Sequence, residues 1–127
     1  MIKIIEIVLV AIGGSIGAVL RYKLIESELM FGFLPISILL ANIVGSFILG
    51  VFMIVSNQWH IDSKYTFLIV FGFCGSLTTM SAFALDSSTM IQNSQIGLAM
   101  INVLLNVSLS LGSVFAGKTL ISLIIDA

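Results

Sequence analysis

Four long apolar segments, separated by short polar connectors, make up most of the chain. They run from Ile4 to Leu20, Pro35 to Val55, Thr66 to Leu85 and Ile96 to Ile125. Each segment is close to the ~20 residues that a helix needs to cross the hydrocarbon core of a bilayer. The pattern predicts an all-α membrane protein in which residues 1–127 form a single domain of four membrane-spanning helices, with both ends of the chain on one side of the membrane.

The connectors hold most of the charged residues and the aromatic residues that mark a membrane interface. Trp59 and Tyr65 flank the connector between the second and third segments, where interfacial aromatic anchors are usual. The first segment lacks the small-residue cleavage pattern of a signal peptide and continues as far as Leu20. We therefore expect it to remain in the protein as a helix.

The composition supports lipid as the solvent for most of the chain, because 59% of the residues are hydrophobic and only 9% are charged. Any function must then lie between the helices. The net charge of -1 and the scattered Lys and Arg residues give no basis for binding nucleic acid. Cys74 has no Cys or His at metal-ligand spacing, and no catalytic constellation is visible, so we do not expect an enzyme.

Positive charge is divided almost evenly between the two sides of the predicted bundle. Lys3, Lys64 and Lys118 fall on one side, and Arg21 and Lys23 fall on the other. Orientation in a membrane follows this asymmetry, which is small here. Two interpretations stay open: a single excess charge sets one orientation, or the chain inserts both ways and pairs with an opposed partner.

Glycines recur at helix-packing spacing in three of the segments. Gly13 and Gly17 form a small-xxx-small pair in the first segment. Small residues recur in the second segment, at Gly45, Ser46 and Gly50, and in the fourth, at Gly112 and Gly117. Such spacing allows the backbones of neighbouring helices to approach closely. We expect helix contacts at these positions.

Amide and hydroxyl side chains lie deep within two of the segments. Asn42 follows Pro35 by seven residues, about 10 Å along a helix. In the fourth segment Asn102, Asn106 and Ser110 recur every four residues, so they share one helix face. Such residues either join helices by hydrogen bonds or line a polar pathway, and the residues alone leave both readings open.

The third segment contains the least helix-like stretch of the chain. The run from Gly72 to Phe83 holds two glycines and four Ser or Thr residues at mid-membrane depth. Gly lowers helix propensity, and Ser and Thr compete for backbone hydrogen bonds, so we expect a break in this helix. Unwound backbone at this depth is tolerated only where it is buried in protein or lines a cavity.

Charged residues are absent from the central turns of all four segments. Glu6 lies near one end of the first segment, and Lys118 is close enough to the end of the fourth to extend its amine to the interface. Transport coupled to protons through an intramembrane carboxylate is therefore disfavoured. Neutral hydrogen-bond donors suit a weakly held anion better.

Three motifs in these segments resemble those of the CrcB/Fluc fluoride channel family. Gly13 to Tyr22 reads GGSIGAVLRY and is similar to the family's GGxxGAxxRY. In the second segment Pro35, Asn42 and Gly45 stand at the family's spacing, although Ser37, Ile38 and Ala41 depart from its usual residues. Gly72 to Phe83 reads GFCGSLTTMSAF and is similar to GFxGGFTTFSTF. Three motifs in the same order make the resemblance strong.

The resemblance implies a subunit of a fluoride-selective channel that exports fluoride passively across the cytoplasmic membrane. It implies an antiparallel dimer of dual topology with two narrow fluoride pathways and a structural Na⁺ ion at the dimer centre. By position, the backbone carbonyls of Gly75 and Thr78 would hold the sodium ion. The residues that match the fluoride pathway, or lie beside those that do, are Asn42, Phe83, Met80, Thr79, Ser81, Asn106, Ser110 and Arg21.

The third motif departs from the family pattern at four positions. Met80 stands where the first phenylalanine of a phenylalanine pair is usual, and Ser76, Leu77 and Ala82 replace a glycine, a phenylalanine and a threonine. The family includes members whose two different subunits form a heterodimer. The departures fit such a subunit, but methionine can also serve as a soft apolar contact in a homodimer.

Two other functions are compatible with four short helices. One is a dual-topology exporter of small cationic drugs, which requires an acidic residue well inside the first helix, and Glu6 lies too near its end. The other is a membrane subunit without transport activity, in which the glycines and amides serve only packing. Neither accounts for the three motifs.

Overall fold

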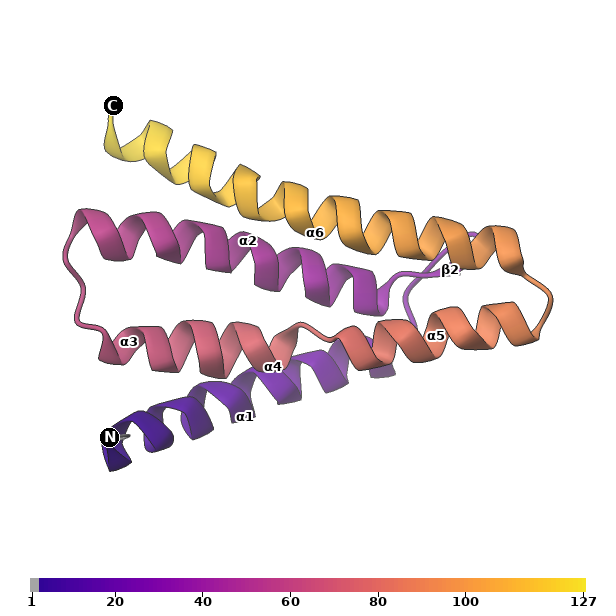
Figure 1. Ribbon diagram of the computed structural model, residues 1–127, viewed down its shortest axis with the longest axis horizontal. Helices are drawn as coiled ribbons and strands as arrows, with labels where there is room; N and C mark the ends of the chain where they lie inside the picture. The colour runs from indigo at the N-terminus through magenta and orange to yellow at the C-terminus, as the bar shows by residue number, and fades with distance from the viewer. Residues whose placement is uncertain (1–2) are drawn as a thin grey trace.

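The computed structural model describes residues 3–127, which form four long helical rods (Figure 1). Within this part of the chain, four helices are long and apolar enough to cross a membrane, as the sequence predicts. The rods are α1 (Ile4–Glu26), α2 (Ser37–Gln58), a third rod of four helical pieces, and α6 (Ile96–Ile125). The pieces of the third rod are α3 (Lys64–Thr66), η1 (Phe67–Cys74), α4 (Gly75–Leu77) and α5 (Met80–Gln92).

The first and third rods continue beyond their predicted apolar segments. α1 extends past Leu20 to Glu26, and Lys23 in its last turn forms a 3.1 Å ion pair with Glu26. Lys at a helix C-terminus is favoured by the helix dipole, so these polar residues continue the helix instead of ending it. The charged and polar residues around positions 21–26 are thus helical, not part of a loop.

A short β-ribbon joins α1 to α2, which the all-α prediction did not anticipate. β1 (Met30–Phe31) pairs antiparallel with β2 (Leu34–Pro35). Gly32 lies in the turn with a φ of +61°, a conformation that glycine adopts without steric cost. The connector is therefore a tight hairpin that leads into α2 at Ser37, whose hydroxyl accepts the Leu29 N–H at 3.0 Å.

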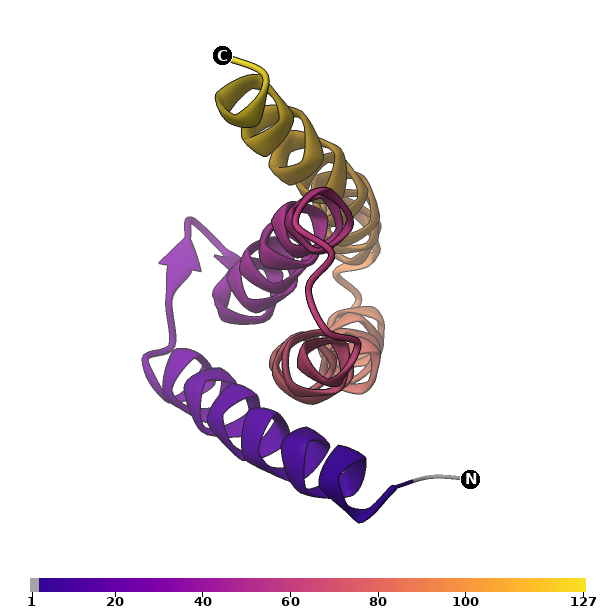
Figure 2. The same ribbon diagram turned by 90° about the vertical axis from the view of Figure 1, so that its left-hand side faces the viewer.

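The four rods form two helix pairs. α6 lies along α2, and α1 crosses the third rod at η1 and α4 (Figures 1 and 2). The first turn of α1 and the last turn of α6 lie at the same end of the bundle (Figure 1), as an even number of crossings requires. Large apolar side chains cover the outside of the bundle, for example Ile4 and Leu104, where lipid would contact them.

Glycines mark both helix pairs. A Cβ atom added at Gly13 or Gly17 would collide with carbonyl oxygens of η1, and one added at Gly50 or Gly117 would collide with the backbone of the opposite helix. The predicted small-residue contacts are therefore confirmed at these positions. Gly112 is the exception, because nothing lies within 4 Å of a Cβ built there.

The third rod is broken at the predicted place. Thr78 and Thr79 adopt extended conformations, with ψ angles of 151° and 123°, and separate α4 from α5. Before the break, the eight residues of η1 form a π-helix, which no feature of the sequence predicted. π-Helical turns are rare in proteins, and those that occur are often found at functional sites.

The contrast between two glycines of α6 gives a test of this packing. Ala raises helix propensity by about 1 kcal/mol over Gly, so Gly112→Ala should raise the stability of the folded protein. Gly117→Ala should lower it by about 1–3 kcal/mol, because the new methyl group meets the Phe47 carbonyl. Thermal unfolding in detergent measures the stability of both variants. Equal shifts of the melting temperature in the two variants would contradict the contact between α2 and α6.

Candidate functional site

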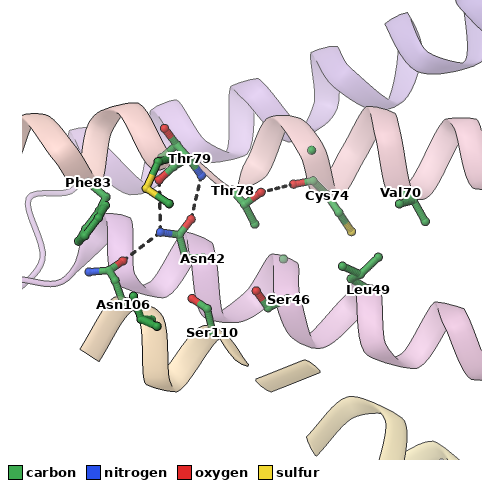
Figure 3. A pocket seen from close by; sticks show the side chains of 14 residues that line it. Asn42, Ser46, Leu49, Val70, Cys74, Thr78, Thr79, Phe83, Asn106 and Ser110 are labelled. Carbon is green, nitrogen blue, oxygen red and sulfur yellow. Dashed lines mark hydrogen bonds between the residues drawn. The ribbon is translucent and has the colours of Figure 1, made fainter. Parts of the chain in front are cut away.

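A cleft lies between α2, the third rod and α6, beside the helix break. It has a volume of about 610 Å³ (Figure 3). Its lining is neutral and consists of glycines and of residues with apolar, amide, hydroxyl and thiol side chains. The lining residues are Asn42, Gly45, Ser46, Leu49, Val70, Cys74, Gly75, Thr78, Thr79, Met80, Phe83, Asn106, Val107 and Ser110.

Asn42 of α2 forms the principal contact with the helix break. Its Oδ1 accepts the backbone N–H of Thr79 at 2.8 Å, and its Nδ2 approaches the Thr79 carbonyl at 3.4 Å (Figure 3). The first bond is short and the second is long for an N–H···O bond. Asn42 therefore satisfies the backbone of the break across the interface between two helices.

Thr79 also caps α5. Its Oγ1 accepts the N–H of Ala82 at 3.2 Å, the usual geometry of a threonine N-cap, and lies 3.3 Å from the Ser81 hydroxyl. Thr79 is only 6% exposed, so both interactions are protected from solvent. The extended conformation of Thr79 is thus held by its own side chain as well as by Asn42.

The break releases backbone carbonyls, including those of Gly75 and Thr78, from their helical donors. In a continuous helix the Gly75 and Thr78 carbonyls would accept from the N–H groups of Thr79 and Ala82. Here the Thr79 N–H donates to Asn42, and the Ala82 N–H donates to the Thr79 side chain. Carbonyl oxygens are suitable ligands for a hard cation such as sodium, so the chemistry of these groups fits the predicted cation site.

An amide chain continues from Asn42 along α6. Asn42 Nδ2 donates to Asn106 Oδ1 at 2.9 Å, and Asn106 Nδ2 donates to both the backbone and side-chain oxygens of Asn102 at 3.0 Å. Asn102 Nδ2 then donates to Ser87 Oγ of α5 at 3.0 Å. Apart from the long 3.4 Å contact of Asn42 with the Thr79 carbonyl, every amide in this chain donates in the same direction, away from the break.

Eight of the ten residues predicted for the two ion sites line this cleft. The remaining two, Arg21 and Ser81, line a separate cleft of about 430 Å³ between α1 and α5, and Thr79 borders both clefts. Arg21 lines no part of the cleft that contains Asn42 and Phe83.

Sequence reasoning did not assign three residues that the structure adds to the site. Ser46 lines the cleft one turn beyond Asn42, and its four-residue spacing from Asn42 could have identified it. Asn102 was assigned to the polar face of the fourth segment, but the sequence does not show that its side chain donates to Ser87. Ser87 is 8% exposed and has no distinguishing spacing, because its role comes from the packing of α5 on α6.

Residues 3–127 contain no cluster of three His, Cys, Asp or Glu side chains that could hold a metal ion. A transition-metal centre built from such side chains is therefore excluded for this part of the chain.

Comparison with known proteins identifies the relatives of this chain. The family model described as "CrcB-like protein, Camphor Resistance (CrcB)" matches residues 8–118. The chain belongs to the CrcB family. A protein of Nitrosopumilus maritimus named fluoride-specific ion channel FluC is 50% identical over 98% of this chain and 98% of its own length.

Other relatives carry the same name. Those of Sulfurihydrogenibium sp. and Methanococcus maripaludis are 40% and 39% identical, covering 87% and 89% of this chain and 92% and 93% of their own lengths. The resemblance stated from the three motifs is thus confirmed. With its four spanning helices, this CrcB protein is a multi-pass protein of the cell membrane and not an enzyme.

Proposed function

We propose that this chain is a subunit of a fluoride-selective channel that carries fluoride passively across the cell membrane. The observation that carries the proposal is the neutral, donor-bearing cleft beside the helix break, in a chain that is 50% identical to a fluoride-specific ion channel. The drug-exporter alternative is disfavoured, because Glu6 lies in the first turn of α1 and accepts the Lys3 N–H at 3.2 Å. A carboxylate at that position is not central in the membrane.

The hydrogen-bond donors of the cleft support passage of an anion. Asn42 Oδ1 is occupied by the Thr79 N–H, so Asn42 can offer an ion only its amide hydrogen, now held weakly at 3.4 Å by the Thr79 carbonyl. Among the hydrogen bonds of residues 3–127, none uses the hydroxyl groups of Ser46 or Ser110, which line the same cleft. These groups can replace part of the water around fluoride.

The apolar residues of the cleft support release of the ion. The edge of an aromatic ring carries partial positive charge, so Phe83 offers a weak electrostatic contact to an anion. Met80 borders the same cleft and is 72% exposed in the single chain. Weak contacts of this kind allow an ion to leave again, as conduction requires.

Arg21 and Ser81 have a separate part in the proposal. They line the cleft between α1 and α5, which meets the main cleft only at Thr79. A guanidinium group there raises the local concentration of anions near the pathway without binding them tightly inside it. Asn106 lines the main cleft, but its amide hydrogens go to Asn102, so its contribution is to hold Asn42.

A second chain in the opposite orientation completes the channel in this proposal. Gly75 is exposed in the single chain although its carbonyl lies at the break, and Met80 is exposed beside it. Two opposed chains that meet here would bring the Gly75 and Thr78 carbonyls of both together around one Na⁺ ion at a two-fold axis. The partner is an identical chain or a paralogous subunit, and lipid surrounds the dimer.

The function is tested by ion flux from liposomes that contain the purified chain. We expect fluoride efflux, measured with a fluoride electrode, and no chloride efflux above that of protein-free liposomes. A complex that passes chloride as readily as fluoride would contradict the proposal. If the chain alone passes neither ion, adding a paralogous subunit distinguishes an obligate heterodimer from a membrane subunit without transport activity.

Replacing Asn42 tests the pathway. Asn42→Leu removes the amide donor and should lower fluoride efflux more than tenfold, since about 1.4 kcal/mol of lost transition-state stabilisation is already a factor of ten. Asn57→Leu is the matched control, because Asn57 is exposed in the last turn of the same helix. Equal efflux from the two variants, on complexes of the same size, would remove Asn42 from the pathway.

Disulfide trapping tests the antiparallel dimer. Thr78→Cys, in a chain whose Cys74 has been replaced, should cross-link to its own copy, because residues near a two-fold axis meet their equivalents. Leu104→Cys on the exposed face of α6 is the control and should not cross-link. More efficient cross-linking at position 104, or a complex that sizes as a monomer in detergent with sodium, would contradict this arrangement.

A further inference from the structure

We infer that Asn102 and Ser87 are positioning residues, which hold the Asn106 amide so that its oxygen binds Asn42 and leaves an Asn42 amide hydrogen facing the cleft. This inference deepens the proposed function and rests on it for its consequence, the presentation of a donor to an anion. The geometry itself stands on four hydrogen bonds of 2.8 to 3.0 Å.

The amide chain has a fixed direction because both of its ends are constrained. At the break, the Thr79 N–H can only donate, so it requires the oxygen of Asn42. At the other end, Asn102 presents two oxygens to Asn106, so it requires the nitrogen of Asn106. These two requirements leave one arrangement in which every amide is satisfied.

A reversed Asn106 would disturb the cleft. Its nitrogen would face the nitrogen of Asn42, and neither could accept a hydrogen bond from the other. Asn42 would then lose its 2.9 Å bond and with it one of the contacts that hold its side chain across the helix interface. The two oxygens of Asn102 prevent this reversal, and Asn102 does not itself line the cleft, so the orientation of Asn42 depends on a residue outside the cleft.

The burial of the chain makes this dependence strong. Asn102 and Asn106 are 3% and 6% exposed, and Ser87 is 8% exposed. In such an environment an unpaired polar group is costly, and hydrogen bonds in a chain support one another. Ser87 anchors Asn102 to α5, so the packing of α5 on α6 is transmitted to Asn42.

The backbone carbonyl of Asn102 limits the size of the expected effect. Asn102→Leu removes the side-chain oxygen but leaves this carbonyl as one acceptor for Asn106. We therefore expect fluoride efflux to fall by about threefold to tenfold, which is less than for the loss of Asn42 itself. Ser87→Ala removes only the last bond and should give a smaller decrease in the same direction.

The direct test is the side-chain amide spectrum of the purified protein labelled with ¹⁵N at asparagine. The five asparagines are Asn42, Asn57, Asn93, Asn102 and Asn106, so the spectrum is simple to assign by substitution. Wild-type protein should give one Asn42 amide pair. Asn102→Leu should give a shifted or second Asn42 pair, and Asn102→Asp, which keeps an acceptor for Asn106, should restore a single pair.

Controls separate positioning from a loss of stability. Ser113→Ala removes a hydroxyl of α6 that bonds only to the Leu109 carbonyl, and it should leave the Asn42 pair unchanged. An unchanged Asn42 pair in Asn102→Leu and Ser87→Ala would overturn the inference, even if both variants melt at lower temperature. If Asn102→Leu does not fold, Ser87→Ala decides alone.

The amide spectrum also tests this inference independently of the proposed function. If wild-type protein carries no fluoride, the channel proposal fails, while the response of Asn42 to Asn102→Leu still supports or overturns the positioning role. If fluoride flux is present and the Asn42 pair does not respond, only the positioning role fails.

Discussion

The hydrogen bond from the Thr79 N–H to Asn42 is the interaction on which the rest of this structure depends. A broken helix in hydrocarbon leaves backbone groups without partners, each at a cost of several kcal/mol, so a break persists only where the protein supplies substitutes. Asn42 and the Thr79 hydroxyl supply them here. Because these side chains accept the N–H groups of Thr79 and Ala82, the carbonyls of Gly75 and Thr78 are left without their helical donors. The same hydrogen bonds therefore stabilise the break and leave these carbonyls free.

Two kinds of contact hold the bundle on either side of this break. Toward the end that carries the chain termini, glycines such as Gly17 and Gly117 bring helix backbones into direct contact. Toward the opposite end, side-chain hydrogen bonds join α6 to α5, through Asn102 and Ser87. The cleft lies beside the break, where α2, the third rod and α6 meet (Figure 3).

Much of this arrangement could be predicted from the sequence, because in a membrane the local pattern carries the main constraint. Length and hydropathy predicted four spans, and the Gly72 to Phe83 run predicted the break, since glycines and hydroxyl residues weaken a helix wherever it is placed. The glycine contacts were predicted in pairs, yet Gly112 makes none within the chain. The spacing identifies a helix face that can make a contact. Which glycine of the pair makes it depends on where the second helix crosses.

The site was less accessible to sequence reasoning, because hydrogen-bond partners belong to tertiary structure. Asn42 and Asn106 were both singled out, but nothing in their spacing shows that one donates to the other across 64 positions of sequence. Ser87 was not identified, and Arg21 lies in a different cleft from most of the residues grouped with it. The β-ribbon and the π-helix η1 also depend on packing that no short motif records.

The cleft lacks charged side chains for the same reason that the helix break needs hydrogen-bond partners. In a membrane, burying a charge or an unpaired polar group is costly. A fixed positive charge among its residues would be costly to bury and would hold a small anion too tightly for rapid exchange. Amide and hydroxyl donors avoid both problems, provided that their orientation is fixed, because an amide that can rotate offers its oxygen as readily as its nitrogen. In this chain the Thr79 N–H occupies the Asn42 oxygen, and Asn106 holds the nitrogen in place. In the proposed channel, a preference for an anion would be set by the direction of these hydrogen bonds and would require no charge inside the cleft.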